Sequence, residues 1–580
     1  MNSNTRSRSG ETSPSQPSAE IVALAADHGN DPEALIPVLQ AVQARQGGLT
    51  CAAIAAVASL LGVPTERAYG VATFYSMFDV PPRPGGVIRV CDGPACWLVG
   101  AARVHGELSD TLGAGWRVER NSCLGLCDRA PAALIGGAQC GPVGGATVPG
   151  APGTATGDAN PYAKARPGEK RVLLAHAGEL DPDSIESALQ FGAYRGLSKA
   201  LADRPGAMVD VVDAAGLTGR GGAGFPTGLK WRAVLQESST QKYIVCNADE
   251  SEPLVFKDRV IIDSNPHLLL EGMAIAGHAV GAGDGYIYIR SEYAPQAERL
   301  ERAVQQAEEA GWLGERIQGS TFSFRIHVHR GAGAYICGEE SALLESLEGK
   351  RGEPRQRPPF PTTYGFRGKP TVVNNVETLA SVPGIALHGS DWYRALGSEA
   401  APGTKLYMLL GHVNRPGLFE APFGFTLRQL IDEFGGGLRP GSAFHFALTG
   451  GAAGTLVPPS LLDVPIDPKS HEKGVSLGAG AFLICDQTVS PVGVLRELMH
   501  FFESESCGKC TSCRVGTHEA RVVLDRLVRG IGRPGDVTLL KELADVLQTA
   551  SFCGLGQSTV IPMNSALAHF PAAFRARIGS

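Results

Sequence analysis

Four cysteines near the C-terminus have a spacing that suits an iron–sulfur cluster. The segment ESCGKCTSCRVG places Cys507, Cys510 and Cys513 in a C-x2-C-x2-C run, and SFCGLG supplies Cys553 further along. This run is typical of a [4Fe-4S] cubane, in which three ligands on one tight loop and one remote cysteine each bind one iron. A structural zinc ion is the alternative, although zinc sites more usually pair two C-x-x-C hairpins.

A second group of cysteines lies in the first quarter of the chain. Cys91 and Cys96 form a C-x4-C pair, and Cys123 and Cys127 form a C-x3-C pair. Four thiolates at two loop tips suit a [2Fe-2S] cluster, with zinc or a set of reduced bystanders as the alternatives. The chain has thirteen cysteines, and the remaining five are predicted to be ordinary thiols: Cys51, Cys140, Cys246, Cys337 and Cys485.

The segment GRGGAG satisfies the dinucleotide-binding pattern G-x-G-x-x-G with Gly219, Gly221 and Gly224, a weak signal in a chain with 74 glycines. In an ordinary Rossmann loop a helix follows the third glycine at once. Here FPTGLKW follows, and we expect Pro226 and Gly228 to delay that helix and leave a longer, more open loop. The glycine amides can donate hydrogen bonds to phosphate oxygens, and Lys230 adds a positive charge.

Composition places limits on the function. The chain has 580 residues, 43% of them hydrophobic and 19% charged, which is typical of a soluble protein of several domains. The net charge of −6 argues against nucleic acid as a partner. There is no apolar run long enough to cross a bilayer and no export signal in MNSNTRSRSGETSPSQPS, so we expect a cytoplasmic protein without direct membrane insertion.

The hydrophobic pattern predicts a multidomain α/β protein. Helical periodicity fills residues 20–80, strand, turn and helix follow around the first cysteines, and strands at 242–248, 285–290 and 324–330 alternate with helices. Two short strands around a Pro-Gly turn begin near 404, and the last ninety residues are mainly helical. The expected units are a disordered tail (1–19), a helical domain (20–82), a small α/β domain (83–140), a linker (141–168), a larger α/β domain (169–400), a small mixed domain (401–485) and a helical domain (486–580).

Several long motifs resemble a known family. GLTGRGGAGFPTGLKW, CNADESEPLVFKDR, GAGAYICGEESALLESLEGKRGEPR and RPPFPTTYGFRGKPTVVNNVETLA resemble the NADH-oxidising flavoprotein subunit of respiratory complex I, as does the C-terminal cysteine run. YGVATFYSMF, CDGPACWLVG and CLGLCDRAP resemble its partner subunit, a thioredoxin-like two-iron ferredoxin. The resemblance covers about residues 20–575 and implies a fusion of the two subunits. It also implies a Rossmann-like FMN and NADH domain, a ubiquitin-like α+β domain and a C-terminal helical bundle with its cluster.

The resemblance also implies the ligands of each cofactor. FMN contacts are expected at Gly219, Arg220, Gly221, Lys230, Asn247, Asp249, Glu250, Tyr335, Gly338, Glu339, Asn374 and Asn375. NADH contacts are expected at Phe225, Glu252, Glu340, Arg357 and Phe360. The first cysteine group would hold the [2Fe-2S] cluster and the second the [4Fe-4S] cluster. No side chain need act as a catalytic acid or base, since FMN carries the hydride transfer.

The residue types fit these roles. Phe225 and Phe360 can sandwich the adenine ring, and acidic side chains can accept from ribose hydroxyls and repel a 2′-phosphate, which favours NAD over NADP. The chain departs from the family at Leu254, where a glycine is common, and at Arg357, where a lysine is usual. The small α/β domain also lacks the helix expected to close a thioredoxin fold.

The fused arrangement is similar to the diaphorase chains of NAD-dependent formate dehydrogenases and NAD-reducing hydrogenases. Nothing in the sequence resembles a molybdenum, tungsten or nickel site, so the resemblance implies a separate catalytic subunit with further iron–sulfur clusters. The complete first cysteine group favours the formate dehydrogenase alpha subunit, with its molybdenum or tungsten site, as that partner. A hydrogenase is the first alternative, and a fused pair of complex I subunits is the second. A zinc-bearing scaffold with a relic nucleotide pocket is the alternative of a different class.

Overall fold

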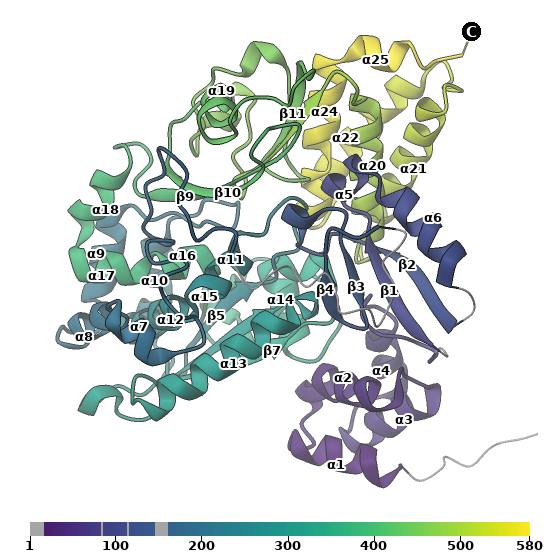
Figure 1. Cartoon of the computed structure of the whole chain (residues 1–580). Helices are drawn as coiled ribbons and strands as arrows, with labels where there is room; N and C mark the ends of the chain where they lie inside the picture. The colour runs from purple at the N-terminus through teal and green to yellow at the C-terminus, as the bar shows by residue number, and fades with distance from the viewer. Residues whose placement is uncertain (1–16, 83–84, 113–114, 145–159, 580) are drawn as a thin grey trace, which may run out of the picture.

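The computed structural model describes residues 17–82, 85–112, 115–144 and 160–579. Most of the predicted tail (1–19) and the middle of the predicted linker (141–168) lie outside these residues. The ranges that are described form five units, which follow one another along the chain from purple to yellow (Figure 1). Among these residues, no helix is both long enough and apolar enough to cross a membrane.

The N-terminal unit is a bundle of short helices beside the small α/β domain (Figure 1). Its helices are α1 (Ala19–Asp27), α2 (Leu35–Gln46), α3 (Cys51–Leu60) and α4 (Thr65–Ala72). Ser18 and Thr50 begin α1 and α3 by accepting a backbone N–H in the first turn, as N-cap residues do. The bundle contacts the central domain, where Gln40 donates to the Gly331 carbonyl at 2.6 Å and Tyr75 donates to Ser346 Oγ at 2.8 Å.

The small α/β domain has a four-stranded sheet in the order β2-β1-β3-β4. Its elements are β1 (Gly86–Cys91), α5 (Pro94–Leu98), α6 (Ala101–Leu112), β2 (Trp116–Asn121), β3 (Ala133–Ile135) and β4 (Ala138–Cys140). β1 runs parallel to β2 and antiparallel to β3. The described residues between β4 and α7 (Ile185–Gln190), 141–144 and 160–184, contain no helix. Residues 145–159 lie outside the described part of the chain, so the missing closing helix stays a prediction.

The central domain is built on a parallel sheet in the order β7-β6-β5-β8, with helices packed against it. The strands are β5 (Tyr243–Ala248), β6 (Asp284–Ile289), β7 (Arg325–Arg330) and β8 (Thr371–Asn375). The helices after α7 are α8 (Arg195–Leu201), α9 (Ala207–Ala215), α10 (Thr227–Gln236), α11 (Lys257–Ser264), α12 (Pro266–Val280), α13 (Ala294–Glu309), α14 (Glu340–Leu347), α15 (Pro361–Tyr364), α16 (Val376–Ala380), α17 (Val382–His388) and α18 (Ser390–Leu396). The predicted strands coincide with β5, β6 and β7. The strand order reverses direction at β5, which gives a crevice between the carboxyl ends of β5 and β8.

A mixed sheet and a helical bundle complete the chain. The sheet has the order β10-β9-β13-β11-β12, the arrangement of a ubiquitin-like domain, and its first two strands flank the predicted Pro-Gly turn. Its elements are β9 (Thr404–Gly411), β10 (Gly417–Pro422), α19 (Leu427–Gln429), β11 (Phe444–Thr449), β12 (Thr455–Val457) and β13 (Ala481–Asp486). The bundle contains α20 (Pro491–Ser504), α21 (Thr511–Val528), α22 (Asp536–Ala550), α23 (Gly554–Ser558), α24 (Val560–His569) and α25 (Pro571–Arg575).

One continuous apolar core joins the units. It runs from Ile21 in α1 to Phe574 in α25 and includes Cys123 and Cys127 of the small α/β domain. The mixed sheet and the small α/β domain each add a separate core of their own. The N-terminal bundle, the central domain and the C-terminal bundle are therefore packed as one body.

The crossing of α12 and α16 depends on a glycine. A Cβ atom on Gly272 would lie 2.1 Å from the Leu379 carbonyl oxygen, a backbone atom that cannot move aside alone. We expect Gly272→Ala to lower the free energy of unfolding by roughly 1–3 kcal/mol because it overpacks this crossing. Gly106 in α6 has nothing within 4 Å of its added Cβ, so Gly106→Ala is the matched control and should gain about 0.5–1 kcal/mol. Urea denaturation of both variants tests this, and equal effects would contradict it.

Candidate functional site

The crevice at the edge of the central sheet is lined by asparagines. Asn247 is the last residue but one of β5, and Asn374 and Asn375 end β8, where Asn247 and Asn375 are register partners on adjacent parallel strands. Strand pairing thus brings Asn247 beside two asparagines that lie far from it in the sequence. Open α/β sheets bind ligands at this position.

The glycine loop lies across the same crevice, but it is not a Rossmann loop. It connects α9 to α10 and precedes the first strand of the sheet instead of following it. Its ends are held by a hydrogen bond from Gly219 N to the Phe225 carbonyl at 2.8 Å and a β-bridge between Thr218 and Pro226. Gly222 has a φ of +121°, a conformation that disfavours other residues.

The expected delay of the following helix is only partly correct. Pro226 is the N-cap residue, and α10 begins directly after it. Gly228 lies inside the helix instead of delaying it. A Cβ there would be 2.5 Å from Asp213 Cα, so Gly228 allows α10 to pack against α9.

Two adjoining cavities of about 590 and 380 Å³ occupy the crevice. The larger is lined by the expected FMN positions Gly219, Gly221, Lys230, Asn247, Gly338, Glu339, Asn374 and Asn375. The smaller shares several of these and adds the expected positions Asp249, Glu250 and Tyr335. The structure therefore brings eleven of the twelve expected FMN positions around one crevice.

Arg220 is the exception. Its side chain turns away from the crevice, donates to Tyr393 Oη at 2.8 Å and the Pro402 carbonyl at 3.0 Å, and lies over the Phe423 ring. Its backbone N–H donates to Thr378 Oγ1, which fixes the glycine loop. The side chain of Arg220 therefore has a structural role here, and Arg220 as an FMN position stays a prediction.

Two buried carboxyl oxygens in the crevice have no hydrogen bond. They are Asp249 Oδ2 and Glu339 Oε1, and both residues line the cavities. Arg357 Nη1 lies 3.5 Å from Glu339 Oε1 as an ion-pair partner. Burial is the main reason that the pKa of Asp249 is raised to about 8, and it raises the pKa of Glu250 to the same value. Buried carboxyl groups with unused hydrogen-bonding capacity, beside glycine amides, fit a ligand that carries polar ring atoms and hydroxyl groups together with a phosphate, as FMN does.

The expected NADH positions divide between the two cavities. Phe225, Glu340, Arg357 and Phe360 line the larger cavity, whereas Glu252 lines the smaller. Phe225 and Phe360 are each 53% exposed, which leaves large aromatic faces free at the mouth. Glu340 pairs with Lys230 at 3.0 Å and lies 3.5 Å from Arg357. Glu252 is occupied within the protein, because it accepts from Tyr335 Oη at 2.6 Å and from Ala453 N at 3.1 Å.

The departure at Leu254 has a backbone consequence. Leu254 is fully buried with a φ of +77°, and a left-handed conformation costs a non-glycine residue about 1–2 kcal/mol. Its N–H is hydrogen bonded to the Cys127 thiol, and the next residue, Val255, lines the smaller cavity. The strained turn thus places one peptide between the first cysteine group and the crevice.

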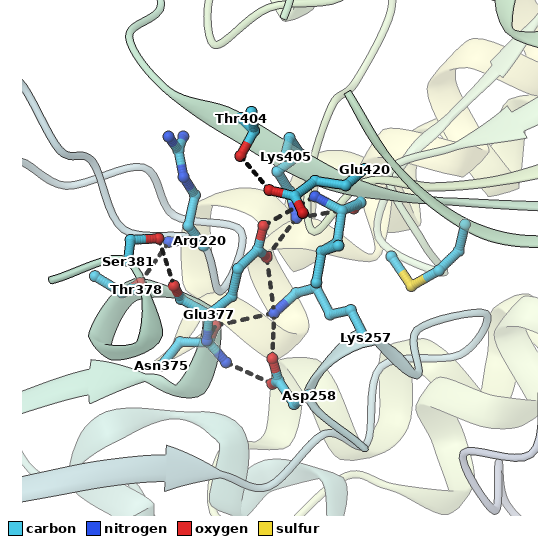
Figure 2. A network of polar contacts seen from close by, with 12 residues as sticks. Arg220, Lys257, Asp258, Asn375, Glu377, Thr378, Ser381, Thr404, Lys405 and Glu420 are labelled. Carbon is cyan, nitrogen blue, oxygen red and sulfur yellow. Dashed lines mark hydrogen bonds and ion pairs between the residues drawn. The ribbon is translucent and has the colours of Figure 1, made fainter. Parts of the chain in front are cut away.

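A buried ionic network adjoins the crevice and includes three residues of its lining, Lys257, Asp258 and Asn375 (Figure 2). Glu377 accepts from Lys405 at 2.6 Å and lies 3.2 Å from Lys257, which also pairs with Asp258 at 2.5 Å. Asn375 joins the network, since it accepts from Lys257 at 2.9 Å and donates to Asp258 at 2.6 Å. Burial would raise the pKa of Glu377, but Lys405 and Lys257 outweigh it and hold the pKa below its usual range. Burial lowers the pKa of Lys405 to about 8.

The four cysteines of the first group converge at one end of β1. Cys91 ends β1, Cys96 lies in α5, and Cys123 and Cys127 enclose the loop after β2. All four are buried, Cys123 Sγ and Cys127 Sγ are 3.4 Å apart, and Cys91 is hydrogen bonded to Cys96 and Cys123. Four converging thiols away from water fit a [2Fe-2S] cluster.

The second group converges at two helix starts. Cys510 is the N-cap residue of α21 and Cys553 that of α23, Cys513 lies in the first turn of α21, and Cys507 precedes them. Burial raises the pKa of the Cys553 thiol to about 11, although the backbone N–H groups of Leu555 and Gly556 point at it and oppose that rise. In the described part of the chain, no three His, Cys, Asp or Glu side chains are arranged around a single ion. Each thiolate of a cubane binds a different iron, so the four sulfur atoms of such a site lie farther apart than the ligands of a single ion.

Family models match the chain in the order of these units. They are the thioredoxin-like [2Fe-2S] ferredoxin (21–149), the Nuo51 FMN-binding domain (212–384), the SLBB domain (406–453) and the NADH-ubiquinone oxidoreductase-F iron-sulfur binding region (493–577). The chain is 45% identical over 409 residues to the F 2 subunit of NADH-quinone oxidoreductase from Rhizobium meliloti, which covers 70% of this chain and 97% of the relative. The chain belongs to the NADH-quinone oxidoreductase-F family.

Other relatives of the oxidoreductase-F family give similar matches. NADP-reducing hydrogenase subunit HndC of Solidesulfovibrio fructosivorans is 43% identical, with 70% of this chain and 83% of the relative covered. A chain of the NAD+-reducing [NiFe]-hydrogenase in its air-oxidised crystal structure superposes with a TM-score of 0.81 at 32% identity, covering 95% of this chain and 94% of that one. The predicted fusion of an oxidoreductase-F flavoprotein with a thioredoxin-like ferredoxin is confirmed, as are the FMN and iron–sulfur domains and the oxidoreductase class.

Some residues of this oxidoreductase-F site were not predicted. Lys257, Asp258, Ala479 and Gly554 also line the cavities. Lys257 and Asp258 belong to the quoted FKDR motif, which was a usable signal. Ala479 and Gly554 come from other domains, and nothing near them in the sequence indicates a cavity.

The raised pKa of Asp249 makes a pH-dependent prediction. A carboxyl group with a pKa of about 8 in the folded protein and 3.8 unfolded stabilises the fold below pH 3.8 and loses that stabilisation as the pH rises towards 8. Asp249→Asn removes the titration, so in flavin-free protein its stability relative to wild type should rise with pH, by up to about 1.4 kcal/mol per unit. Thermal unfolding between pH 5 and 8 measures this, with exposed Asp27→Asn as the control; a pH-independent difference would contradict it.

Proposed function

We propose that this chain is the diaphorase subunit of a multisubunit enzyme, exchanging hydride with NAD(H) and single electrons with a partner subunit. The observation that carries the proposal is the position of Gly554, which follows Cys553 and lines both cavities. The loop of the second cysteine group is therefore part of the flavin crevice. When bound, FMN accepts a hydride and passes its electrons on one at a time.

The protein's own residues supply binding and position. The glycine amides and Lys230 would hold the phosphate, and Asn247, Asn374, Asn375, Asp249 and Glu339 would orient the flavin. Phe225 and Phe360 would stack on the adenine ring. The acidic side chain of Glu340 at the mouth supports NAD over NADP, and comparison of NADH with NADPH as donors tests that preference.

The nucleotide site can be tested with the two exposed aromatic residues. We expect Phe225→Ala and Phe360→Ala each to raise the KM for NADH roughly 5- to 150-fold, because a lost base–aromatic stack costs about 1–3 kcal/mol. kcat should change little, since ground state and transition state lose the same contact. The assay is NADH-dependent ferricyanide reduction. Tyr364→Ala is the control, because Tyr364 is equally exposed at 57% but lines neither cavity. An unchanged KM would place the adenine elsewhere.

The cluster ligands can be tested by matched cysteine variants. We expect Cys553→Ala to abolish the [4Fe-4S] EPR signal and lower the iron content by about four atoms per chain, while FMN remains bound. Cys485→Ala, at a buried thiol in β13, should leave the iron content unchanged. Iron loss in both variants, or in neither, would contradict the ligand assignment.

We propose a hydrogenase as the partner, because the chain of the NAD+-reducing [NiFe]-hydrogenase matches this chain over nearly its whole length. A formate dehydrogenase alpha subunit is the second candidate, favoured by the complete and buried first cysteine group. The test is purification from the native host with co-purifying subunits, followed by NAD+ reduction with hydrogen and with formate. Hydrogen activity with nickel supports the first partner, and formate activity with molybdenum or tungsten supports the second. NADH oxidation with neither donor would favour a complex I pair.

A further inference from the structure

The loop between Cys123 and Cys127 is bound to the central domain by buried side chains. Arg259 donates to the Gly125 carbonyl at 3.3 Å and pairs with Asp128 at 2.7 Å. Tyr293 donates to Glu250 Oε2 at 3.0 Å and contacts the Gly125 carbonyl at 3.3 Å. The loop of the proposed [2Fe-2S] ligands therefore lies against a side chain that also holds Glu250, a residue of the flavin crevice.

Arg290, just after β6, connects the two sites most directly. Its guanidinium donates from Nη2 to the Cys123 carbonyl at 2.6 Å and from Nη1 to the Glu250 carbonyl. Its partner in charge is Glu292, 2.8 Å away. Arg290 is 2% exposed and Glu292 4% exposed, so water does little to screen either charge.

The loop from Cys123 to Cys127 is fixed against the residues around Arg290. Gly125 has a φ of +70°, and a Cβ atom there would lie 2.0 Å from Tyr293 Oη, so the loop lies directly on the tyrosine. Cys123, which accepts from Arg290, and Cys127, which is bonded by Leu254 N–H, are fixed at either end. A positive charge is thus held permanently beside the thiolates.

Apart from Glu292, the neighbouring carboxyl groups add little negative charge beside Arg290. The carboxyl groups of Asp249 and Glu250 have a pKa of about 8 and are largely neutral at pH 7. Arg259 is balanced by Asp128 at 2.7 Å and Asp263 at 3.7 Å. Glu505, which accepts from Tyr335 N, is half-buried, and partial removal from water raises its pKa.

Net charge, hydrogen bonds and solvent exposure set the reduction potential of an iron–sulfur cluster. We propose that Arg290 raises the reduction potential of the cluster held by Cys91, Cys96, Cys123 and Cys127, and that Glu292 limits this effect. Reduction adds one electron and hence one negative charge to the cluster. The positive charge of Arg290 therefore stabilises the reduced cluster more than the oxidised cluster. Arg290 is a positioning residue, since it acts through the Cys123 loop. The inference rests on the proposed cysteine ligands.

The test is an EPR-monitored redox titration of the cluster-loaded full chain with dithionite. In Arg290→Met the equilibrium constant for one-electron reduction should fall at least about tenfold, which corresponds to about 59 mV. Arg290→Lys keeps the charge and should stay nearer to wild type, and Glu292→Gln should shift the midpoint to more positive potential. The [4Fe-4S] signal is the internal reference, and exposed Arg302→Met is the matched control.

Opposite shifts in Arg290→Met and Glu292→Gln, without change in the [4Fe-4S] midpoint, would support the inference. An unchanged [2Fe-2S] midpoint in Arg290→Met would overturn it. If Arg290→Met does not fold, an unchanged midpoint in Glu292→Gln would overturn it instead. A wild-type protein without a [2Fe-2S] signal, or with a signal that survives Cys127→Ser, would show instead that the ligand assignment is wrong, and the inference would fall with it. NADH-dependent dye reduction separates that case from failure of the diaphorase function.

Discussion

The carboxylate of Glu377 is the charge on which the junction of the central and mixed-sheet domains depends. It stands between two buried ammonium groups, Lys257 from α11 and Lys405 from β9. Removing one partner of a buried pair generally costs about 3–5 kcal/mol, because an unpaired charge is left behind. Here two ammonium groups share the carboxylate. The network also holds Asn375, so the shape of the crevice follows from the same contacts that join the domains.

The cofactor sites meet at one edge of the central sheet, but no single domain contains them. The crevice takes side chains from the ends of β5 and β8, Ala479 from the mixed-sheet domain and Gly554 from the C-terminal bundle. The first cysteine group contacts the same edge of the sheet at two points. Leu254 N–H is hydrogen bonded to the Cys127 thiol, and Arg290 donates to the Cys123 carbonyl. If FMN binds in this crevice as proposed, its site is complete only when these domains are packed together. The ionic network holds two of the cavity residues, Lys257 and Asn375, in place.

Local patterns in the sequence were sufficient for the parts of the site that are local in the chain. The cysteine runs and the glycine loop are short segments whose chemistry depends on spacing, and the strands at 242–248, 285–290 and 324–330 are apolar enough to be predicted. β2 and β8 were not predicted as strands, since β2 is polar and only half buried and β8 is short and ends in two asparagines.

The directions of side chains were harder to predict from the sequence than the backbone structure was. Arg220 sits in the glycine loop, yet Tyr393 and Pro402, far along the chain, draw its guanidinium to the other side. Gly228 looks like a helix breaker in sequence, but its role is to let two helices pack. Arg290 directly follows β6, and nothing near it in the sequence indicates a role. Only the packing of the Cys123 loop against it shows which group its guanidinium contacts. These outcomes depend on partners that are distant in the sequence.

The continuous core from Ile21 to Phe574 decides what kind of electron carrier the ferredoxin unit is. Exposing apolar surface costs about 2.5 kcal/mol per 100 Å², and Cys123 and Cys127 lie within that core. Separating the unit from the central domain would expose this shared apolar surface, so the structure holds the ferredoxin unit by packing, in contrast to a carrier joined to its partner by a tether alone.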